Sequence, residues 1–557
     1  MTEDRHGLVV ETGYTQRARA KSKGVTAKAS SSPLPRLPPT RDGPISTVAW
    51  RRKGRGGVKS HHAEANIAYR SDRIPLRRFV NGLPVRSASS LSSGDPCAIL
   101  KWSETFAYTA RDTWSPVDMQ DHRRATLPSR DSTASTPRDF RLRLTTAWTM
   151  GGVVLLLLAP LTGPELIILC LIAPLAWLPA GKRNIFHGPT ATFVALYLTT
   201  GYLALNTRWS PDPVTAIETV GLIVICVGIV DMTLIVLERL EVHALEAMAV
   251  GLVAGVIIGG VYICFEAFSG QWVRRMLVPW QPWLRPEARH TFVDARGVEN
   301  FQLHLLNLNI AALSMLFWPA MLAIKALKPA QSTNRLLLLG LLPALLGVLR
   351  AEHTTSKLAL LGSLGIYLLY QVRPAIARGL TITCWVTATM LIVPIASALY
   401  AQKLYTSPWL FRSAQERVVF WGYTSEQVAK APLLGVGISA TRVYHVTKGG
   451  ANAPQAPGSE FRLETGWHSH SVYLQAWYET GAIGAVLLLA IGILVLRSFA
   501  AAPEVAQPFL WSTFVACALM AGSSFSLWAQ WFMATLGMVA ALAGLGTTLL
   551  TKRAPQL

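Results

Sequence analysis

Three polar segments interrupt the apolar part of this chain and carry the residues best suited to chemistry. The last of them contains His470, which stands immediately before an apolar run. An imidazole changes its charge near neutral pH, so His470 at the mouth of a membrane helix has the chemistry that a proton transfer there requires. The alternative is that His470 only caps a helix at the membrane interface, where polar residues are common. The two earlier segments supply cations, in the form of Arg350 with Lys357 and then Arg417.

The elements that must position these residues are apolar helices. Of the 557 residues, 51% are hydrophobic, and the mean hydropathy of +0.34 is high for a soluble protein. From Thr145 onward, apolar runs long enough to cross a bilayer recur with short polar breaks. We predict an all-α polytopic membrane protein with about 12 transmembrane helices in residues 144–557. The predicted spans are 144–161, 164–180, 189–207, 214–236, 243–268, 305–325, 336–350, 356–372, 379–401, 474–497, 508–525 and 529–550.

The short loops predict the orientation of these spans. With the N-terminal residues on the cytoplasmic side, every second loop carries Lys or Arg, as the positive-inside rule requires. Both termini are then cytoplasmic. Two long loops, 269–304 and 402–471, face the periplasm, and the second lies between spans 9 and 10 and ends at the histidine segment.

Residues 1–143 differ in composition from the rest of the chain. They hold half of the 52 Lys and Arg residues and are rich in Ser, Pro and Gly. Such a segment cannot bury enough apolar surface to offset its conformational entropy, so we predict a disordered, basic cytoplasmic tail. Its basic run at 51–55 could bind nucleic acid or anionic lipid, but a solvated tail with no nucleic-acid partner is the favoured interpretation. A start further downstream, for example at Met119, is the alternative to a genuine tail.

Other side chains give no sign of a metal or another cofactor. His468 and His470 could chelate a metal together, but no third ligand is apparent. The six cysteines are spread singly, without a C-x-x-C pair. The loop 402–471 contains no Asp, so the usual metal-dependent nucleotide-sugar enzymes are disfavoured.

The polar segments resemble, in their order along the chain, the signature of the O-antigen ligase family of bacterial membrane enzymes. The most specific part is His470-Ser471, followed after nine residues by Gly-x-x-Gly. The other parts are Ser356-Lys357 with the leucines after it, Arg417-x-x-x-Trp421, and the run from Pro432 to Gly437 that contains Gly435. The resemblance covers mainly residues 340–490 and has no counterpart before residue 144.

One position departs from the family pattern, because Lys357 stands where the family has Arg. A lysine binds phosphate as a point charge, without the bidentate geometry of a guanidinium. Either Lys357 fills this role or Arg350 replaces it, and the sequence leaves both open.

The resemblance implies an enzyme of the bacterial inner membrane that moves a polysaccharide from undecaprenyl diphosphate to a sugar hydroxyl of lipid A-core or of another glycan. It implies a metal-independent, inverting glycosyl transfer at the periplasmic face. Arg417 would stabilise the diphosphate leaving group, and His470 would act as the base towards the acceptor hydroxyl. The residues expected to bind substrate are Lys357, Arg350, Trp421, Gly435, Gly437 and Ser471.

Three other functions stay open. A polymerase of the same superfamily would extend the chain on the same carrier, although the His–Ser–Gly spacing favours a ligase. A protein O-oligosaccharyltransferase would use the same donor. A transporter would need polar residues near the membrane midplane, and these are sparse in the predicted spans.

Overall fold

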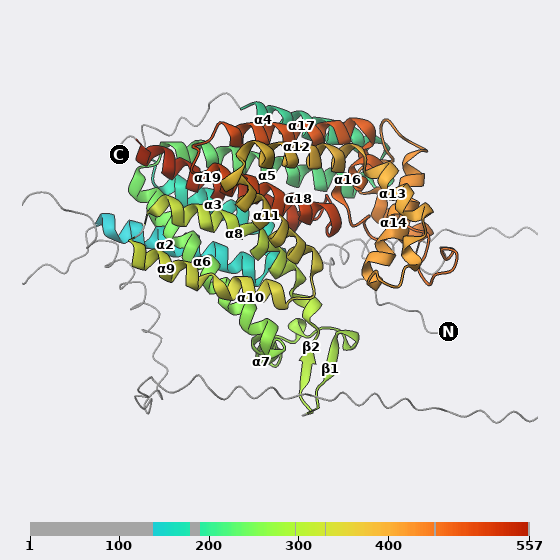
Figure 1. Ribbon diagram of the computed structural model, residues 1–557, viewed down its shortest axis with the longest axis horizontal. Helices are drawn as coiled ribbons and strands as arrows, with labels where there is room; N and C mark the ends of the chain where they lie inside the picture. The colour runs from blue at the N-terminus through green and yellow to red at the C-terminus, as the bar shows by residue number, and fades with distance from the viewer. Residues whose placement is uncertain (1–136, 179–189, 296, 329, 450–452, 555–557) are drawn as a thin grey trace, which may run out of the picture. The chain divides into compact units, whose positions relative to one another are not determined.

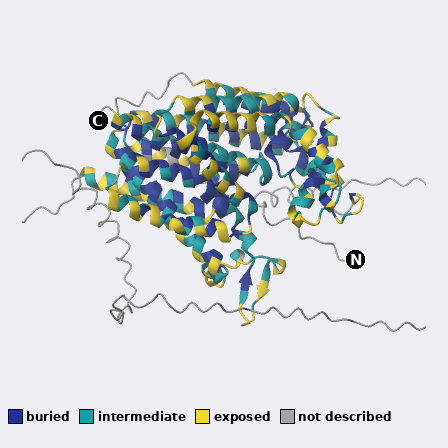
Figure 2. Cartoon of the chain, in the orientation of Figure 1, coloured by how far each residue is buried: buried dark blue, intermediate teal, exposed yellow. Residues whose placement is uncertain are grey.

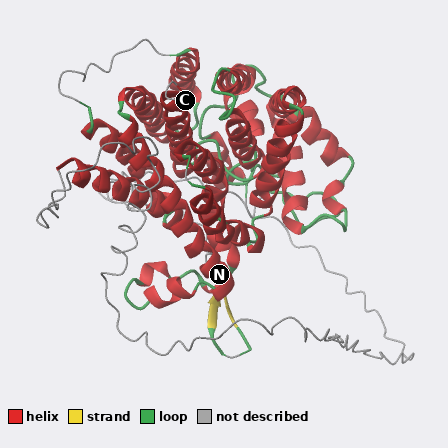
Figure 3. Cartoon of the chain, turned by 60° about the vertical axis from the view of Figure 1, so that its left-hand side comes forward, coloured by secondary structure: helices red, strands yellow, loops and turns green. Residues whose placement is uncertain are grey.

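The computed structural model describes residues 137–178, 190–295, 297–328, 330–449 and 453–554, all within the unit Asp95–Leu557. These residues form helices with one short hairpin, so the predicted all-α class is confirmed (Figures 1 and 3). The predicted tail 1–143 lies outside the described residues, except for its last residues. These belong to the first helix, α2, which begins at Pro137 and so starts before the span predicted from 144.

The helices are α2 (Pro137–Leu158), α3 (Gly163–Ala176), α4 (Ala191–Asn206), α5 (Pro213–Arg239), α6 (Val242–Ser269), α7 (Trp272–Leu277), α8 (Asn307–Leu327), α9 (Gln331–Gly340), α10 (Leu342–Arg350), α11 (Thr354–Val372), α12 (Pro374–Met390), α13 (Ile392–Ala401), α14 (Arg412–Val428), α15 (Ala440–Lys448), α16 (Val472–Gln475), α17 (Gly481–Ala500), α18 (Gln507–Ser523) and α19 (Gln530–Arg553). A π-helical turn at Ala476–Thr480 joins α16 to α17. The strands β1 (Thr291–Val293) and β2 (Glu299–Phe301) pair antiparallel, with Thr291 opposite Phe301.

Seven of the described helical stretches are long and apolar enough to cross a membrane, and the bent pair α12 and α13 would make an eighth. The count of about 12 spans therefore stays a prediction. The remaining predicted spans are also helical, but α3, α4 and α18 have only 14, 16 and 17 residues. The helix α11 is less apolar because its first turn contains Lys357 and three hydroxyl side chains.

The bend between α12 and α13 measures 69° and has a local cause. Pro394 lies in the first turn of α13 and has no N–H with which to continue the hydrogen bonds of α12. The indole of Trp477 donates a hydrogen bond of 2.8 Å to the carbonyl of Thr389, which is near the end of α12. The bend turns α13 towards α14, and these two helices pack together beside the bundle (Figure 1).

The core of the bundle lies around α8. In the most apolar stretch of this helix, 78% of the residues are buried (Figure 2). Next to it, α2 packs closely against α6. Three glycines of α6 at four-residue spacing, Gly251, Gly255 and Gly259, face α2, and a Cβ on any of them would lie within 3 Å of its atoms. Small residues at this spacing let two membrane helices approach each other's backbone.

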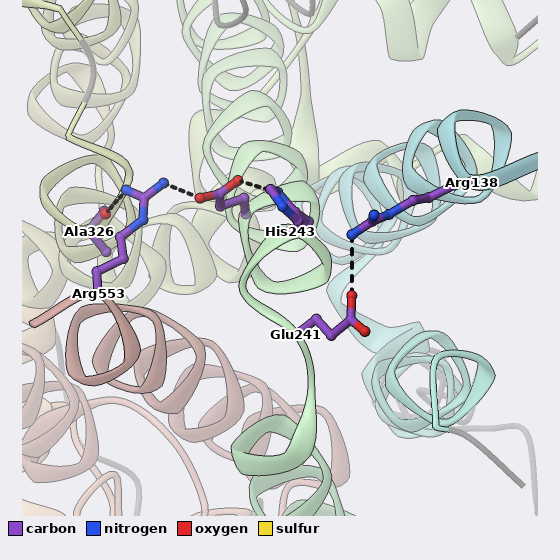
Figure 4. Close-up of polar contacts among 6 residues, drawn as sticks. Arg138, Glu241, His243, Ala326 and Arg553 are labelled. Carbon is purple, nitrogen blue, oxygen red and sulfur yellow. Dashed lines mark hydrogen bonds and ion pairs between the residues drawn. The ribbon is translucent and has the colours of Figure 1, made fainter. Parts of the chain in front are cut away.

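Polar contacts tie several helix ends together at the end of the bundle away from the histidine segment. The Arg553 guanidinium, at the end of α19, donates to Ala326 O of α8 and forms an ion pair with Glu246 of α6 (Figure 4). Arg138 of α2 forms an ion pair of 3.3 Å with Glu241, the residue that precedes α6. These contacts join the starts of predicted spans 1 and 5 to the ends of predicted spans 6 and 12. The predicted topology puts all four of these ends on the same side of the membrane.

Candidate active site

Four segments that are distant in sequence meet at the candidate site. The helix α14 carries Arg417, and the segment after Thr465 leads to His470 beside it. His353 precedes α11, and Ser524 follows α18. The sequence singled out the first two segments by residue, whereas it gave His353 only as part of a polar turn and did not indicate Ser524.

His470 is held by its backbone and by two rings. Its φ of +51° is left-handed, which is uncommon for a residue other than glycine. Its ring lies nearly parallel to that of Phe420 on α14, with 6.1 Å between the centroids and 11° between the planes. The ring of His468 lies 4.1 Å away on the centroids. Because these contacts fix the ring, the nitrogen atoms of His470 have a defined direction.

The carbonyl oxygen of Ser524 receives contacts from both histidines. Nδ1 of His470 lies 3.4 Å from this oxygen, and Nε2 of His468 lies 3.2 Å from it. A carbonyl oxygen only accepts hydrogen bonds, so the nitrogen that faces it carries the proton in each ring. In a neutral His470 this leaves Nε2 with the free lone pair, which is the atom that could accept a proton from a substrate.

Arg417 is the cation of the cluster. Its side chain is half-buried, and within the described residues no hydrogen bond or ion pair holds its guanidinium. Burial lowers the pKa of this guanidinium below its ordinary value. Burial also lowers the pKa of His470 well below 6.5, and the charges of His468 and Arg417 lower it further. The nearby charge of Glu416 partly offsets the effect of burial on Arg417. The site therefore combines a guanidinium that has no described hydrogen bond with a neutral imidazole.

His353 adds another imidazole to the cluster, and this one is buried. Its Nδ1 lies 2.6 Å from the hydroxyl of Ser356, and its Nε2 lies 3.2 Å from the hydroxyl of Ser524. Burial lowers the pKa of His353 to about 4, with a further contribution from the charge of Arg417. The ring links the start of α11 to the loop after α18, and this loop also contacts His470. The only sequence signals for it were the polar turn at 350–356 and the Ser-Ser pair at the end of a predicted span.

Trp421 and Ser471 support the backbone that carries the histidines. The indole N–H of Trp421 donates to the carbonyl of Ser469 over 2.8 Å, which fixes α14 to this segment. Ser471 is fully buried, and its hydroxyl accepts a hydrogen bond of 3.4 Å from the N–H of Leu474 as the N-cap of α16. Both side chains thus already have partners within the protein.

The two glycines of the predicted Gly-x-Gly turn pack against the π-helical turn. The N–H of Gly437 donates to Glu479 O over 3.0 Å, and the N–H of Gly435 donates to Ala431 O over 3.0 Å. A Cβ on Gly435 would lie 2.4 Å from the backbone of Glu479, and its φ of +70° also favours glycine. The geometry gives these glycines a packing role, because their N–H groups are already used.

Glu479 is the residue that the sequence analysis missed in this region. It is fully buried and accepts hydrogen bonds from the N–H groups of Ser439 and Thr441, at 2.7 and 3.0 Å. Its carboxylate also accepts from Gln475 over 3.2 Å and from the indole of Trp528. It therefore joins the glycine turn, the helix after His470 and the loop after Ser524. The only signal in the sequence was an acidic residue near the start of an apolar span.

The two other predicted cations lie differently. The guanidinium carbon of Arg350 lies 5.9 Å from the ring centroid of Phe268 at the end of α6, and the side chain is exposed. Lys357 is half-buried on α11, next to the buried Ser356 that contacts His353. Successive helical residues point about 100° apart, so Lys357 lies on a different face of α11 from Ser356. Neither cation makes a described contact with His470 or Arg417.

No group of three His, Cys, Asp or Glu side chains within the described ranges is arranged to hold a metal ion. The described contacts of the site are hydrogen bonds, ring contacts and the charge of Arg417.

One comparison with known proteins bears on this site. Residues 339–489 match the family described as O-antigen ligase, from the end of α9 into α17. The match contains His353, Arg417 and His470 but ends before Ser524. No curated protein matches the chain. The chain therefore carries an O-antigen ligase domain at residues 339–489, within a set of helices of which several are long and apolar enough to span a membrane.

Proposed function

We propose that this protein is a ligase-type glycosyltransferase of the bacterial inner membrane. It would transfer a polysaccharide from undecaprenyl diphosphate to a sugar hydroxyl of lipid A-core at the periplasmic face. The observation that carries the proposal is the position of Arg417. Its guanidinium makes no described hydrogen bond or ion pair, has only the nearby charge of Glu416, and lies close enough to lower the pKa of His470. A cation that awaits an anion, beside a neutral imidazole, is suited to a reaction with an anionic leaving group and an attacking hydroxyl.

In this reaction, the acceptor oxygen attacks the anomeric carbon of the donor sugar. The bond between that carbon and the phosphate oxygen breaks, and undecaprenyl diphosphate leaves with the electron pair. The hydroxyl proton passes to Nε2 of His470. Attack opposite the leaving group inverts the anomeric centre. Arg417 stabilises the charge that develops on the diphosphate, so the described residues supply both functions without a metal.

The donor itself would increase the basicity of His470. Burial and positive charge lower the pKa of this imidazole in the free protein. A bound diphosphate offsets the charge of Arg417, which removes one cause of the lowered pKa. The imidazole then becomes a better base when the donor is in place.

The remaining predicted residues take supporting roles in this proposal. Trp421 and Ser471 fix the backbone around His470, and Gly435 and Gly437 let the turn at 435–437 pack on Glu479. Lys357 or Arg350 would contact the phosphates of the donor at the edge of the site. Both residues lie within a few positions of His353 in the sequence, at the junction of α10 and α11.

The inner-membrane orientation is also a proposal. The starts of α2 and α6 and the ends of α8 and α19 meet at the end of the bundle that carries Arg138, Arg553 and Lys552. This supports a cytoplasmic position for that end under the positive-inside rule. The histidine site at the other end is then periplasmic.

The test is the lipopolysaccharide of a strain deleted for this gene, complemented with wild type, with His470→Ala or with His243→Ala. The control residue His243 is exposed and lies at the far end of the bundle. We expect His470→Ala to leave lipid A-core without long chains while undecaprenyl-linked polymer accumulates, and His243→Ala to restore the wild-type pattern. A core that bears a single repeat unit would assign a polymerase instead. Full ligation by a stably inserted His470→Ala protein would remove this residue from the mechanism.

A further inference from the structure

A polar cavity lies beside α14. It has a volume of about 260 Å³ and is bounded by α14, α15 and the π-helical turn before α17. Its wall contains three tyrosines, which are Tyr423, Tyr444 and Tyr478. Neither His470 nor Arg417 lines it, so it is distinct from the site described above.

One wall of the cavity is built around a largely buried contact between an imidazole and a carboxylate. Nδ1 of His445 lies 2.9 Å from a carboxylate oxygen of Glu464, and the two side chains are only 15% and 12% exposed. The ring of Trp467 lies 4.6 Å from that of His445 on the centroids. This pair holds α15 against the segment that leads to His470, so the cavity has a fixed wall.

The other walls mix aromatic rings with hydrogen-bonding groups. Nζ of Lys448 lies 4.6 Å from the centroid of Tyr444, and Lys430 donates to Gln427 over 2.6 Å. All four residues line the cavity. A sugar has the matching surface, because its C–H face packs on an aromatic ring while its hydroxyls bond to amides, carboxylates and ammonium groups. A prenyl chain would leave these polar groups unpaired, and the carboxylate of Glu464 opposes a diphosphate.

The cavity also lies at a defined distance from the reacting groups. On α14, Tyr423 comes one turn after Phe420, the residue stacked on His470, and Gln427 comes two turns after it. One to two turns correspond to about 5–10 Å along the helix axis. Thr465, on another wall, begins the segment that continues to His470. A glycan that reacts at His470 can therefore reach this cavity with a neighbouring sugar.

We propose that this cavity is a saccharide subsite, which holds a sugar one or two units away from the one that reacts. The inference rests on the proposed function and adds to it a determinant of which glycan is used. The sugar belongs either to the donor polysaccharide or to the acceptor core, since both are glycans that meet at His470.

The experiment compares Tyr444→Ala and Gln427→Ala with Val446→Ala, a control on α15 that is exposed and does not line the cavity. Transfer is measured with a donor that carries the full repeat unit or only its first sugar, and with complete or truncated lipid A-core. We expect Tyr444→Ala to raise KM about tenfold either for the donor with the full repeat unit or for the complete lipid A-core, with kcat little changed. The matching truncated substrate should show no such rise. Tyr444→Phe should behave like wild type, because it keeps the ring face that packs against the sugar.

The substrate whose KM rises, donor or acceptor, identifies the glycan that occupies the cavity. Unchanged KM values for every substrate with both variants would overturn the subsite, as would an equal rise for full and truncated glycans. Binding of the free core oligosaccharide and of the free repeat unit, measured by saturation-transfer NMR, separates the subsite from the ligase reaction. If wild type transfers no glycan, a saturation signal that Tyr444→Ala loses would still support the subsite, whereas no signal from either sugar would overturn it.

Discussion

The ring of Phe420 lies almost parallel to the ring of His470, with 6.1 Å between their centroids. Phe420 stands one helical turn after Arg417 on α14, so a single rigid helix carries the proposed phosphate clamp and also packs against the proposed base. The spacing between the two functions is therefore set by α14 and not by the flexibility of the long loop that contains it.

Arg417→Lys should reduce transfer by at least about tenfold, because an ammonium cannot replace the bidentate contacts of a guanidinium with phosphate. The matched control is Arg412→Lys on the same helix, where the guanidinium is 76% exposed and pairs with Glu460. We expect this control to keep close to wild-type activity. The measurement is the initial rate of glycan transfer in proteoliposomes with each purified variant. Equal rates for the two variants would contradict a phosphate clamp at Arg417.

The stability of the protein should fall as the pH is lowered from about 6.5 to 4. The folded state holds the pKa of His353 at about 4, whereas an unfolded histidine titrates near 6.5. Between these values the unfolded chain binds a proton that the folded protein does not, so acid favours unfolding by up to roughly 3 kcal/mol. This contribution is absent above the unfolded pKa. The low pKa of His470 acts in the same direction.

The measurement is the Tm of the purified protein in detergent between pH 7.5 and 4.5. His353→Gln should flatten the dependence of Tm on pH, because the replaced side chain no longer titrates. His243→Gln, at an exposed position where the imidazole lies 3.5 Å from Glu246, should change the slope less than His353→Gln does. Parallel curves for wild type and His353→Gln would show that this imidazole is not held neutral.

Glu479→Gln should destabilise the protein by about 2 kcal/mol or more. The carboxylate accepts hydrogen bonds from several donors at once, and an amide would place its own N–H groups against some of them. Because Glu479 joins the glycine turn to the loop after Ser524, transfer should fall as well. The control is Glu426→Gln, an exposed carboxyl on α14. An unchanged Tm for Glu479→Gln would mean that the buried network contributes little.

Gly435→Ala should be more destabilising than Gly458→Ala, although both glycines have nearly the same left-handed φ, +70° and +74°. At Gly458 the new methyl group meets no atom within 4 Å, so only the backbone preference of about 1–2 kcal/mol is lost. At Gly435 it would lie 2.4 Å from the backbone of Glu479. Thermal unfolding of the two variants measures the difference. Equal losses would show that the turn at 435 relaxes away from Glu479.

Local sequence was sufficient for the class of fold and for two residues of the site. Apolar runs of the right length predict membrane helices, and even the bend at 390–392 has a visible cause in Pro394. His470 stood out because a titratable residue beside a membrane span is conspicuous, and Arg417 because the run Arg417-x-x-x-Trp421 resembles the family pattern. The number of membrane spans could not be predicted from the sequence in the same way. A helix such as α3, with 14 residues, is so short that its length and hydropathy do not decide whether it crosses the membrane.

The partners of the site residues could not be predicted in the same way. The contact between His470 and Ser524 joins positions 54 residues apart, and the one between His353 and Ser524 spans 171. Such contacts depend on which helix ends come together, and an apolar run carries no information about its neighbour. For the same reason, nothing in the sequence near Arg350 indicated that it packs on Phe268.

The three glycines of α6 that face α2 determine which substitutions this helix pair tolerates. At Gly251, Gly255 and Gly259 the shortest distance from an added methyl group to α2 would be 2.5, 2.7 and 2.4 Å. Ile258 and Val261 on the same helix are exposed and point away from these contacts, so many apolar side chains fit there. If every position of α6 is varied, the variants that still fold should therefore keep glycine at these three positions. The exposed positions Ile258 and Val261 should accept many apolar side chains.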